Sequence, residues 1–540
     1  MCAPRWHGSR TEARFLLRIL ARRAVLSVVK TVRSMGASLA GTTAELVTVE
    51  ALFLGEDKGL LQLQLTGLPD NVLRESRGRI VAALESNGLV CGGGRLLLNL
   101  VPASRRKSGE SLDLSLALGA VVAMGHLPAK ALAKTLFLGE MGIDGRLHAV
   151  PGGLAAALAA REAGLERVFA PLATAEEAAA VRELEVLPVR HLAQVFAHLT
   201  GQRPIVALSG AVETERQPAP GGPSLDEVRG LAQAKLALAL AATGGHGLLL
   251  VGPPGAGKSL LARRLTRLLP ALEREERLEI TQAQSAAGRW PGGLASERPF
   301  RAPHHTISYA AMVGGGAQAT PGEITLAHGG VLFLDELPEF RREVLESLRQ
   351  PLESGTVLIA RVARRVELPA RFQLVAAMNP CPCGYLGHAR TPCRCPPASV
   401  QRYRRRISGP LLDRIELIQE VQPASLDELA GAFESRPSAD AGEHSEATLI
   451  AHVRRARELA LARGQRLPNA RLDANDLDRH APLDGESRQL LERASRARGL
   501  SARALQSLRR VARSVADLEG SVSLRPAHMA QALAMRSKLL

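Results

Sequence analysis

The sequence has no run of about 18 uncharged apolar residues, the length that a membrane-spanning helix requires. The longest apolar stretch, around Leu112 to Leu127, contains Asp113 and two glycines. We therefore expect no spanning helix and no membrane partner. Cysteine is also scarce: six in 540 residues cannot form a disulfide scaffold, and four of them lie within fifteen residues. This clustering indicates a metal site or local structure in a reducing compartment, so we expect a cytoplasmic protein.

Lysine is rare too, because only eight of the 69 basic residues are lysine and the others are arginine. The formal net charge of +16 favours a polyanionic partner, nucleic acid first. Residues 1–34 hold eight basic residues and one acidic residue, so the rest of the chain gives a weaker indication. This extension lacks the apolar core and small-residue cleavage site of a secretory signal. A transit-like arm is one interpretation, and an over-long gene model with its true start at Met35 is the one that we favour.

The length predicts three or four domains of roughly 100–200 residues each. Short apolar runs alternate with helix-like stretches in two parts of the chain, which is typical of α/β domains. Two segments rich in proline, glycine and polar residues read as linkers. The C-terminal part has helical spacing with arginines on its outer faces. We predict a basic extension (1–34), an α/β domain (35–206), a linker (207–224), a second α/β domain (225–422), a linker (423–446) and an all-α domain (447–540).

The strongest motif is a glycine-rich loop between an apolar strand, residues 248–251, and an amphipathic helix. It matches G-x-x-x-x-G-K-[ST] in the strand–loop–helix context that this phosphate-binding loop requires. Glycines let backbone N–H groups surround phosphates, and the helix directs its positive end at them. Lys258 is expected to reach the β- and γ-phosphates, and the Ser259 hydroxyl to ligate Mg²⁺. The predicted cofactor-binding loop comprises Gly252, Pro253, Pro254, Gly255, Ala256, Gly257, Lys258 and Ser259.

Two further apolar strands end in polar residues that complete this chemistry. Residues 331–334 lead into Asp335 and Glu336, about 75 residues after the loop. Asp335 is expected to hold Mg²⁺ through a water, and Glu336 to polarise the attacking water. Residues 372–378 lead into Asn379, which can position that water, the role called sensor 1. A buried strand ending in two acids, or an asparagine in a turn, would be unremarkable alone, but beside the phosphate loop they favour an ATP hydrolase.

Five segments of the chain resemble magnesium-chelatase-like AAA+ ATPases of the YifB/ComM type: GPPGAGKS, RPFRAPHHTIS, GGGAQATPGEITLAHGGVLFLDELPEF, FQLVAAMNPCPCGYLGH and ISGPLLDRIEL. The resemblance covers about Met35 to the C-terminus, and it implies a homo-hexamer, promoted by ATP bound between subunits. It also implies an arginine finger at Arg414, which stabilises transition-state charge on the neighbour's ATP. Arg503 matches the sensor-2 arginine on the helical domain. The alternative for each is a surface or salt-bridge arginine. The implied fold is a P-loop AAA+ core followed by an all-α C-terminal lid.

The N-terminal part resembles the Lon protease domain, which has the ribosomal S5 domain 2-like fold. Ser111 falls where the Lon-type nucleophile would lie. A serine needs a nearby base, and Lon has a lysine just after a Gly-Gly pair, where this chain has Ala155 and Ala157. Lys107 is the nearest lysine in sequence to Ser111. We expect a non-proteolytic Lon-like module for assembly or partner binding.

Two small clusters contain residue types that can bind a metal ion. Four cysteines, Cys381, Cys383, Cys393 and Cys395, form two C-x-C pairs separated by nine residues. They predict either a structural Zn²⁺ site or a turn of thiols, with C-x-C tighter than the usual C-x₂-C spacing. Adjacent His304 and His305 would point in opposite directions on an extended chain, so we expect a structural or interface role rather than chelation.

Several arginine groups are candidates for DNA phosphate contacts, which do not depend on sequence. Residues 356–372 are expected to form two short strands around a turn, with Arg361, Arg364 and Arg365 as the predicted DNA contacts. A solvated basic hairpin is nearly as good an explanation. For the other groups, a phosphate track, a subunit interface and a solvated face remain open. They are Arg402, Arg404, Arg405, Arg406, Arg454, Arg455, Arg457, Arg509 and Arg510.

The sequence and the resemblance together lead to one preferred function and two alternatives. We expect a ring-shaped motor that acts on DNA and depends on ATP and Mg²⁺. Its expected role is that of a branch-migration or helicase-like factor in the recombination of incoming or branched DNA during natural transformation. Recombination proteins are expected as further partners. The alternative is a protein-remodelling ATPase that uses the Lon-like domain as an adaptor. A magnesium-chelatase subunit is disfavoured, because no porphyrin site or partner-subunit feature is evident.

Overall fold

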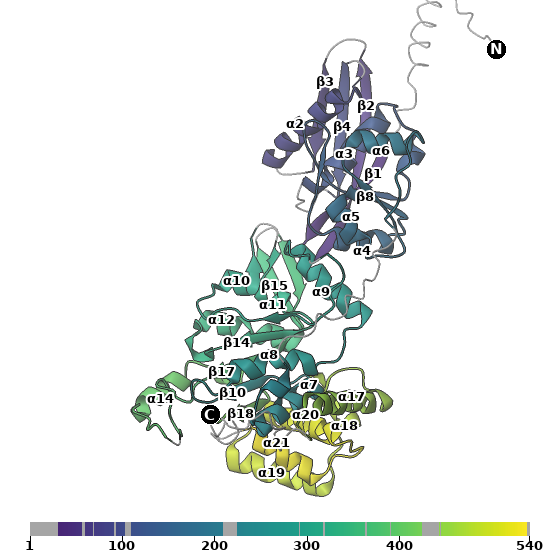
Figure 1. Ribbon diagram of the computed structural model, residues 1–540. Helices are drawn as coiled ribbons and strands as arrows, with labels where there is room; N and C mark the ends of the chain where they lie inside the picture. Colours follow the sequence, from purple (N-terminus) through teal and green to yellow (C-terminus); the bar gives the residue numbers. More distant parts are fainter. Residues whose placement is uncertain are drawn as a thin grey trace, which may run out of the picture. The chain divides into compact units, whose positions relative to one another are not determined.

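The computed structural model of the chain describes residues 31–56, 60–67, 70–90, 93–102, 110–208, 224–290, 292–316, 319–361, 364–388, 390–423, 442 and 444–536. These residues form two compact units, one within Met1–Leu39 and Thr43–Ala211 and the other within Ala40–Thr42 and Val212–Leu540 (Figure 1). Most of the predicted extension and of both predicted linkers, and Lys107, lie outside the described residues. Within them, no helix has the length and apolar character needed to cross a membrane.

The first unit is built on a seven-stranded sheet with parallel and antiparallel pairs. In β4, Leu96, Leu98 and Leu100 are buried in alternation, the pattern of a strand with one covered face. Strand β1 begins before Met35, and its Val32 is buried in the core. In sheet order the strands are β3 (Leu61–Thr66), β4 (Gly93–Val101), β2 (Thr43–Glu56), β1 (Val32–Ala40), β5 (Thr135–Phe137), β8 (Arg167–Pro171) and β9 (Glu185–Val189).

Helices and a small hairpin complete the described part of the first unit. Helix α3 is buried from Asp113 to Val122, because nearly all of its side chains are apolar. The helices are α2 (Asp70–Ser86), α3 (Asp113–Ala123), α4 (Gly153–Glu162), α5 (Leu172–Ala178) and α6 (Leu192–Leu199), and the hairpin pairs β6 (Glu140–Met141) with β7 (Leu147–His148).

The second unit contains a five-stranded sheet in which every neighbouring pair is parallel. The order is β11 (Phe300–Arg301), β14 (Val331–Leu334), β17 (Gln373–Met378), β10 (Leu248–Val251) and β18 (Leu417–Glu420). The three central strands are buried along their whole length, which explains their continuous apolar runs. Since β17 lies between β10 and β14, the residues that follow these three strands meet at one edge of the sheet.

Helices and two hairpins surround this sheet. The helices are α7 (Ala232–Gly244), α8 (Lys258–Leu268), α9 (Arg274–Ala286), α10 (Tyr309–Val313), α11 (Glu323–Leu326), α12 (Arg342–Ser347), α13 (Arg349–Ser354), α14 (Pro397–Arg404) and α15 (Gly409–Leu412). The hairpins pair β12 (Gly314–Gly315) with β13 (Thr320–Pro321), and β15 (Thr356–Arg361) with β16 (Arg364–Pro369).

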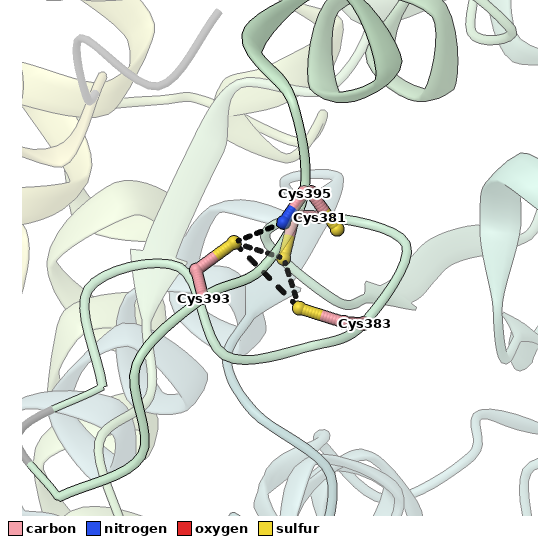
Figure 2. Close-up of side chains that lie close together, drawn as sticks. All are labelled: Cys381, Cys383, Cys393 and Cys395. Atoms are coloured by element: carbon pink, nitrogen blue, oxygen red, sulfur yellow. Dashed lines mark hydrogen bonds between the residues drawn. The ribbon is translucent and has the colours of Figure 1, made fainter.

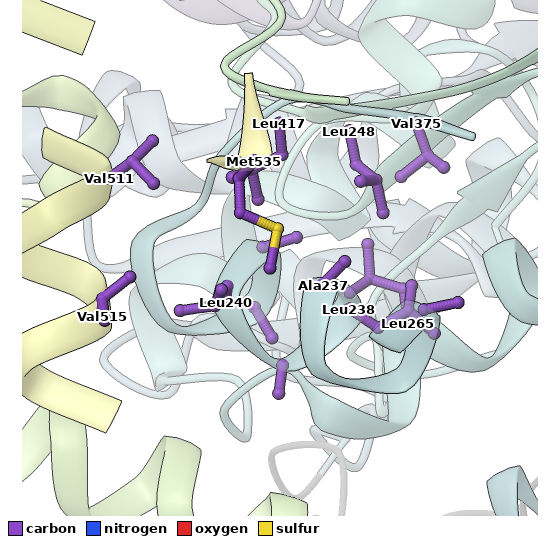
Figure 3. Close-up of a cluster of buried hydrophobic side chains, with 14 of the residues drawn as sticks. Ala237, Leu238, Leu240, Leu248, Leu265, Val375, Leu417, Val511, Val515 and Met535 are labelled. Atoms are coloured by element: carbon purple, nitrogen blue, oxygen red, sulfur yellow. The ribbon is translucent and has the colours of Figure 1, made fainter. Parts of the chain in front are cut away.

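The C-terminal region is helical, as expected, and it shares a core with the parallel sheet. Figure 3 shows Val511 and Val515 of the C-terminal helices in the same apolar cluster as Leu240 of α7 and Leu248 of β10. The helices are α17 (Glu446–Ala462), α18 (Ala474–His480), α19 (Gly485–Arg498), α20 (Ala502–Leu518) and α21 (Pro526–Met535). The molecule is therefore a mixed α/β protein with a helical C-terminal region.

Candidate nucleotide-binding site and cysteine cluster

The glycine-rich loop joins β10 to α8, as the motif predicts. Gly257 precedes the helix with φ of 85°, a left-handed conformation that favours glycine. No side chain caps the first turn of α8, so its N–H groups remain available to an anion. Gly252 is needed for a different reason: a Cβ there would lie 2.2 Å from the carbonyl oxygen of Val421. The loop therefore has both the donors and the close backbone packing that a phosphate cradle requires.

Lys258 is the lysine of this loop, and its ammonium group is held by oxygen atoms. Its Nζ donates to the carbonyls of Gly252 (2.7 Å) and Pro253 (2.8 Å) and lies 3.2 Å from Asn379 Oδ1. Burial lowers the pKa of Lys258, and the negative charges of Asp335 and Glu336 oppose that shift. Lys258 and Asn379 are 121 residues apart in the sequence. They meet because the loop follows β10 and Asn379 follows β17, which are neighbouring strands of the sheet.

Ser259 and Asp335 also come together. The Ser259 hydroxyl donates to Asp335 Oδ2 at 2.5 Å, and Asp335 Oδ1 accepts the N–H of Glu336 at 2.9 Å. A hydroxyl and a carboxylate are hard oxygen ligands, the kind that Mg²⁺ prefers. This donor set fits the predicted ion.

Glu336 occupies a strained position beside the two histidines. Its φ is 53°, which is unusual for a residue other than glycine, and its Oε2 lies 3.3 Å from His305 Nδ1. The rings of His304 and His305 lie 4.1 Å apart between centroids, so the prediction that they point in opposite directions was wrong. The chain turns at His305 instead of continuing as a strand. The contact of His305 with Glu336 was missed, because nothing in the sequence places that loop beside the strand end.

Arg414 and Arg503 meet at a residue that sequence reasoning also missed. Arg414 Nη2 lies 2.5 Å from one carboxylate oxygen of Glu353, and Arg503 Nη2 lies 2.6 Å from the other. Hydrogen bonds from Arg414 and Arg503 lower the pKa of the Glu353 carboxyl. Asn379 thus joins the loop residues, whereas the two arginines join each other through Glu353, which carries no motif.

The four predicted cysteines converge, and the described part of the chain adds no histidine or carboxylate to the group (Figure 2). Their sulfur atoms all lie within 4.8 Å of one another, and Cys381 Sγ is 3.4 Å from Cys383 Sγ and 3.6 Å from Cys393 Sγ. Tetrahedral Zn²⁺ with bonds of about 2.3 Å places sulfur atoms about 3.8 Å apart, so the separations fit. Hydrogen bonds from the backbone N–H groups of Tyr385 and Arg394 lower the pKa of the Cys383 thiol to about 6.

The basic hairpin has the expected form. Strands β15 and β16 pair from Thr356↔Pro369 to Arg361↔Arg364, with the connecting turn at residues 362–363 outside the described residues. Val357, Ile359, Val366 and Leu368 are buried on the core, while Arg365 is exposed. The hairpin therefore stands on an apolar base with its arginines at the far end.

Other arginine groups have protein partners. Arg404 lies within 3.4 Å of the Pro380 carbonyl, and Arg406 pairs with Glu339 at 2.7 Å. Arg509 pairs with Asp478 at 2.9 Å, and Arg454 with Glu458 at 3.2 Å. Each of these four arginines therefore has at least one partner within the described residues.

The predicted nucleophile position lies in the first unit. Ser111 Oγ donates to the carbonyl of Ala37 at 2.7 Å. Ala155 and Ala157, at the position of the Lon lysine, are buried in α4. Both alanines therefore contribute to the core.

Comparison with known proteins gives matches along most of the chain. Three family models match: "Magnesium chelatase, subunit ChlI" over residues 224–429, "Subunit ChlI of Mg-chelatase" over residues 55–174, and "Magnesium chelatase, subunit ChlI C-terminal" over residues 442–536. The chain is 38% identical over 513 residues to the protein named YifB of Escherichia coli (strain K12), which covers 92% of this chain and 95% of that protein.

Two other relatives match over a similar extent. The chain is 38% identical over 505 residues to "Competence protein ComM" of Haemophilus influenzae, covering 92% of this chain and 96% of the relative. It is 40% identical over 512 residues to a protein of Mycobacterium tuberculosis (strain ATCC 25618 / H37Rv), covering 93% of this chain and 98% of the relative. Because these matches cover more than nine tenths of the chain, they include both compact units.

Proposed function

The chain belongs to the family of magnesium-chelatase-like proteins of the YifB and ComM type, and we propose that it is an AAA+ ATPase that works as a ring-shaped motor on DNA. The observation that carries the ATPase proposal is the convergence of Lys258, Ser259, Asp335 and Asn379 at one edge of the parallel sheet. The name of the Haemophilus relative, a competence protein, supports a role in natural transformation. The proposed activity is branch migration during recombination of the incoming DNA.

Each residue at this edge has a defined task in the proposed reaction. ATP with Mg²⁺ supplies the phosphoanhydride bond whose hydrolysis drives the motor. Lys258 and the loop N–H groups hold the phosphates, and Ser259 and Asp335 hold the ion. Glu336 takes the proton of the attacking water, which Asn379 orients. The exposed side chain of Glu336, 55% accessible, is open to such a water.

Arg414 and Arg503 are proposed to complete the site of a neighbouring protomer. Their described contacts are with Glu353 and, for Arg414, the carbonyl of Pro410. In a ring, guanidinium groups on one protomer can stabilise transition-state charge at the next. The proposed assembly is a homo-hexamer promoted by ATP, with the number of protomers taken from the family resemblance.

The β15–β16 hairpin is the proposed DNA contact. Its strands carry Arg361, Arg364 and Arg365 beside the connecting turn, and buried side chains fix the other end of the hairpin. Arginines placed this way bind phosphates without reading sequence. The first unit is proposed to be a Lon-like module without protease activity, because alanines occupy the place of the base.

We also propose that the four cysteines hold a structural Zn²⁺. Four thiolates leave no open position for water, so the ion would stabilise the loop beside the Asn379 strand. Metal analysis of the purified protein should find one zinc per chain, and Cys383→Ser should lose it and lower the melting temperature by several degrees. Cys91→Ser, which changes a cysteine far from the four in the sequence, is the control. Full zinc content in Cys383→Ser would contradict the proposal.

ATP hydrolysis measured with and without DNA tests the motor proposal. Single-stranded or branched DNA should raise turnover severalfold, with the effect reduced at high salt. A chain that begins at Thr31 removes most of the basic extension yet keeps the buried Val32 of β1, so it shows whether the extension alone binds DNA.

Turnover that DNA leaves unchanged would contradict the motor and favour the protein-remodelling alternative. In that case an unfolded protein client, rather than DNA, should stimulate hydrolysis. Absence of ATP hydrolysis under every condition would contradict both.

A further inference from the structure

Glu353 lies at the end of the short helix α13, and it joins two arginines from distant parts of the chain. Arg414 follows α15, and Arg503 lies in the first turn of α20. One carboxylate oxygen contacts each guanidinium, at 2.5 Å and 2.6 Å. Glu353 is therefore the link between the parallel-sheet region and the C-terminal helices at this point.

The Arg414 side of the link differs from an ordinary surface ion pair, whereas the Glu353 side chain (57% exposed) and the Arg503 side chain (41% exposed) form an exposed pair. Exposed pairs contribute little, because both side chains lose freedom and solvent screens their charges. The Arg414 side chain is only 10% exposed, and its Nε is buried without a hydrogen-bond partner among the described residues. Its other contact is the donation of Nη1 to the Pro410 carbonyl at 2.7 Å. Without the Glu353 carboxylate, Arg414 would keep one neutral partner.

Charge makes the carboxylate necessary as well. Two guanidinium groups held close together repel each other, and an anion between them offsets that repulsion. The rigid fork of arginine also means that one carboxylate contact fixes the direction of the remaining donors. Glu353 can thus hold both arginines in one arrangement.

Space for a ligand group lies next to this arrangement. A hollow of about 620 Å³ is lined by Glu346, Arg349, Gln350, Glu353, Ser354 and Arg414. The Arg503 side chain is 41% exposed, so it is accessible from solvent. A phosphate group from outside this chain can approach from there.

We propose that Glu353 is a positioning residue that holds Arg414 and Arg503 together as a two-arginine clamp for the terminal phosphate of ATP on a neighbouring protomer. This inference rests on the proposed ATPase function. Glu353 acts through the arginines and touches no substrate. Its loss should therefore affect the rate of hydrolysis and leave the binding of nucleotide by the same chain intact.

Steady-state ATP hydrolysis by the full-length Glu353→Gln variant tests the clamp. The substitution keeps the side-chain shape and removes the charge. We expect kcat to fall about tenfold with KM for ATP changed less than twofold, because a preorganised charge is removed from the transition state only. Glu458→Gln is the matched control: it removes the carboxylate of another Arg–Glu pair, Arg454–Glu458 on α17, and should keep wild-type kcat.

Mixing of variant subunits separates a positioning role from a merely structural one. Glu353→Gln mixed with Lys258→Ala should regain hydrolysis, because some sites then combine an intact loop with an intact clamp. Glu353→Gln mixed with Arg414→Ala should regain none, because both defects lie in the clamp. Damage to folding would give no such difference.

The possible outcomes distinguish a failure of the proposed ATPase function from a failure of the clamp. Wild-type protein without ATPase activity would overturn the proposed function itself. An active wild type with unchanged or raised kcat in Glu353→Gln, or with rescue by Arg414→Ala, would overturn the clamp alone. If Glu353→Gln does not fold, Glu353→Asp takes its place, with a smaller kcat loss expected and the same mixing pattern required.

Discussion

The two parts of the candidate catalytic machinery are built in different ways. Lys258, Ser259, Asp335 and Asn379 follow strands of one parallel sheet, and the order β14-β17-β10 brings them together. Arg414 and Arg503 come from a loop and a helix, and a single carboxylate joins them. The first part is determined by sheet topology, and the second depends on one side chain. The first should therefore tolerate changes around it better than the second.

The largest effect is expected from removal of the loop lysine. Lys258→Ala should abolish ATP hydrolysis and nucleotide-dependent assembly, because no other described ammonium group lies among the loop carbonyls. Phosphate release and size-exclusion chromatography with ATP measure both properties. The exposed Lys130 of the first unit supplies the control, Lys130→Ala. Assembly of Lys258→Ala at wild-type ATP concentrations would place nucleotide binding elsewhere.

A loss of about 10³-fold in kcat is expected for Arg414→Ala, the usual size for an arginine finger. Nucleotide affinity, measured by fluorescence of a labelled ATP analogue, should change little, since the described side-chain contacts of Arg414 are with Glu353 and Pro410. The effect should exceed that of Glu353→Gln, which leaves both arginines present. Equal losses in the two variants would mean that the clamp works only as a unit.

Glu336→Gln should bind ATP normally and hydrolyse it about 10²-fold more slowly, because general-base assistance of this kind is worth about 10²–10⁴. The glutamine retains the contact with His305 Nδ1 and loses the charge. Single-turnover hydrolysis and nucleotide retention after gel filtration separate binding from chemistry. Normal turnover would show that another group activates the water.

The smallest effect is expected at the hairpin. Arg365→Ala should reduce DNA stimulation of hydrolysis severalfold and leave the basal rate unchanged, because one phosphate contact among several is lost. Turnover at several DNA concentrations measures this. A matched change at the ion-paired Arg454, Arg454→Ala, should leave stimulation intact. Undiminished stimulation in Arg365→Ala would contradict the proposed contact of Arg365 with DNA.

The sequence predicted the parallel-sheet region well for a physical reason. Continuous apolar strands followed by polar residues identify strand ends, and Lys258, Asp335 and Asn379 each follow such a strand. The four-cysteine cluster was also predictable, since all its members lie within one short segment. Local patterns carry both features.

Long-range contacts of single side chains could not be predicted. Glu353 is one glutamate among many on a short helix, and its partners lie 61 and 150 residues away. The directions of His304 and His305 were predicted wrongly, because a turn replaces the extended chain on which the prediction was based. The sequence specifies such contacts only through the completed fold.

The central claim is that the loop of one protomer and the arginine pair of the next act on the same nucleotide. The most direct test mixes Lys258→Ala subunits with Arg414→Ala subunits, each inactive alone, and measures phosphate release. Since their defects lie on opposite sides of a shared site, the mixture should regain a substantial part of wild-type turnover. A mixture that assembles yet stays as inactive as its components would contradict the claim.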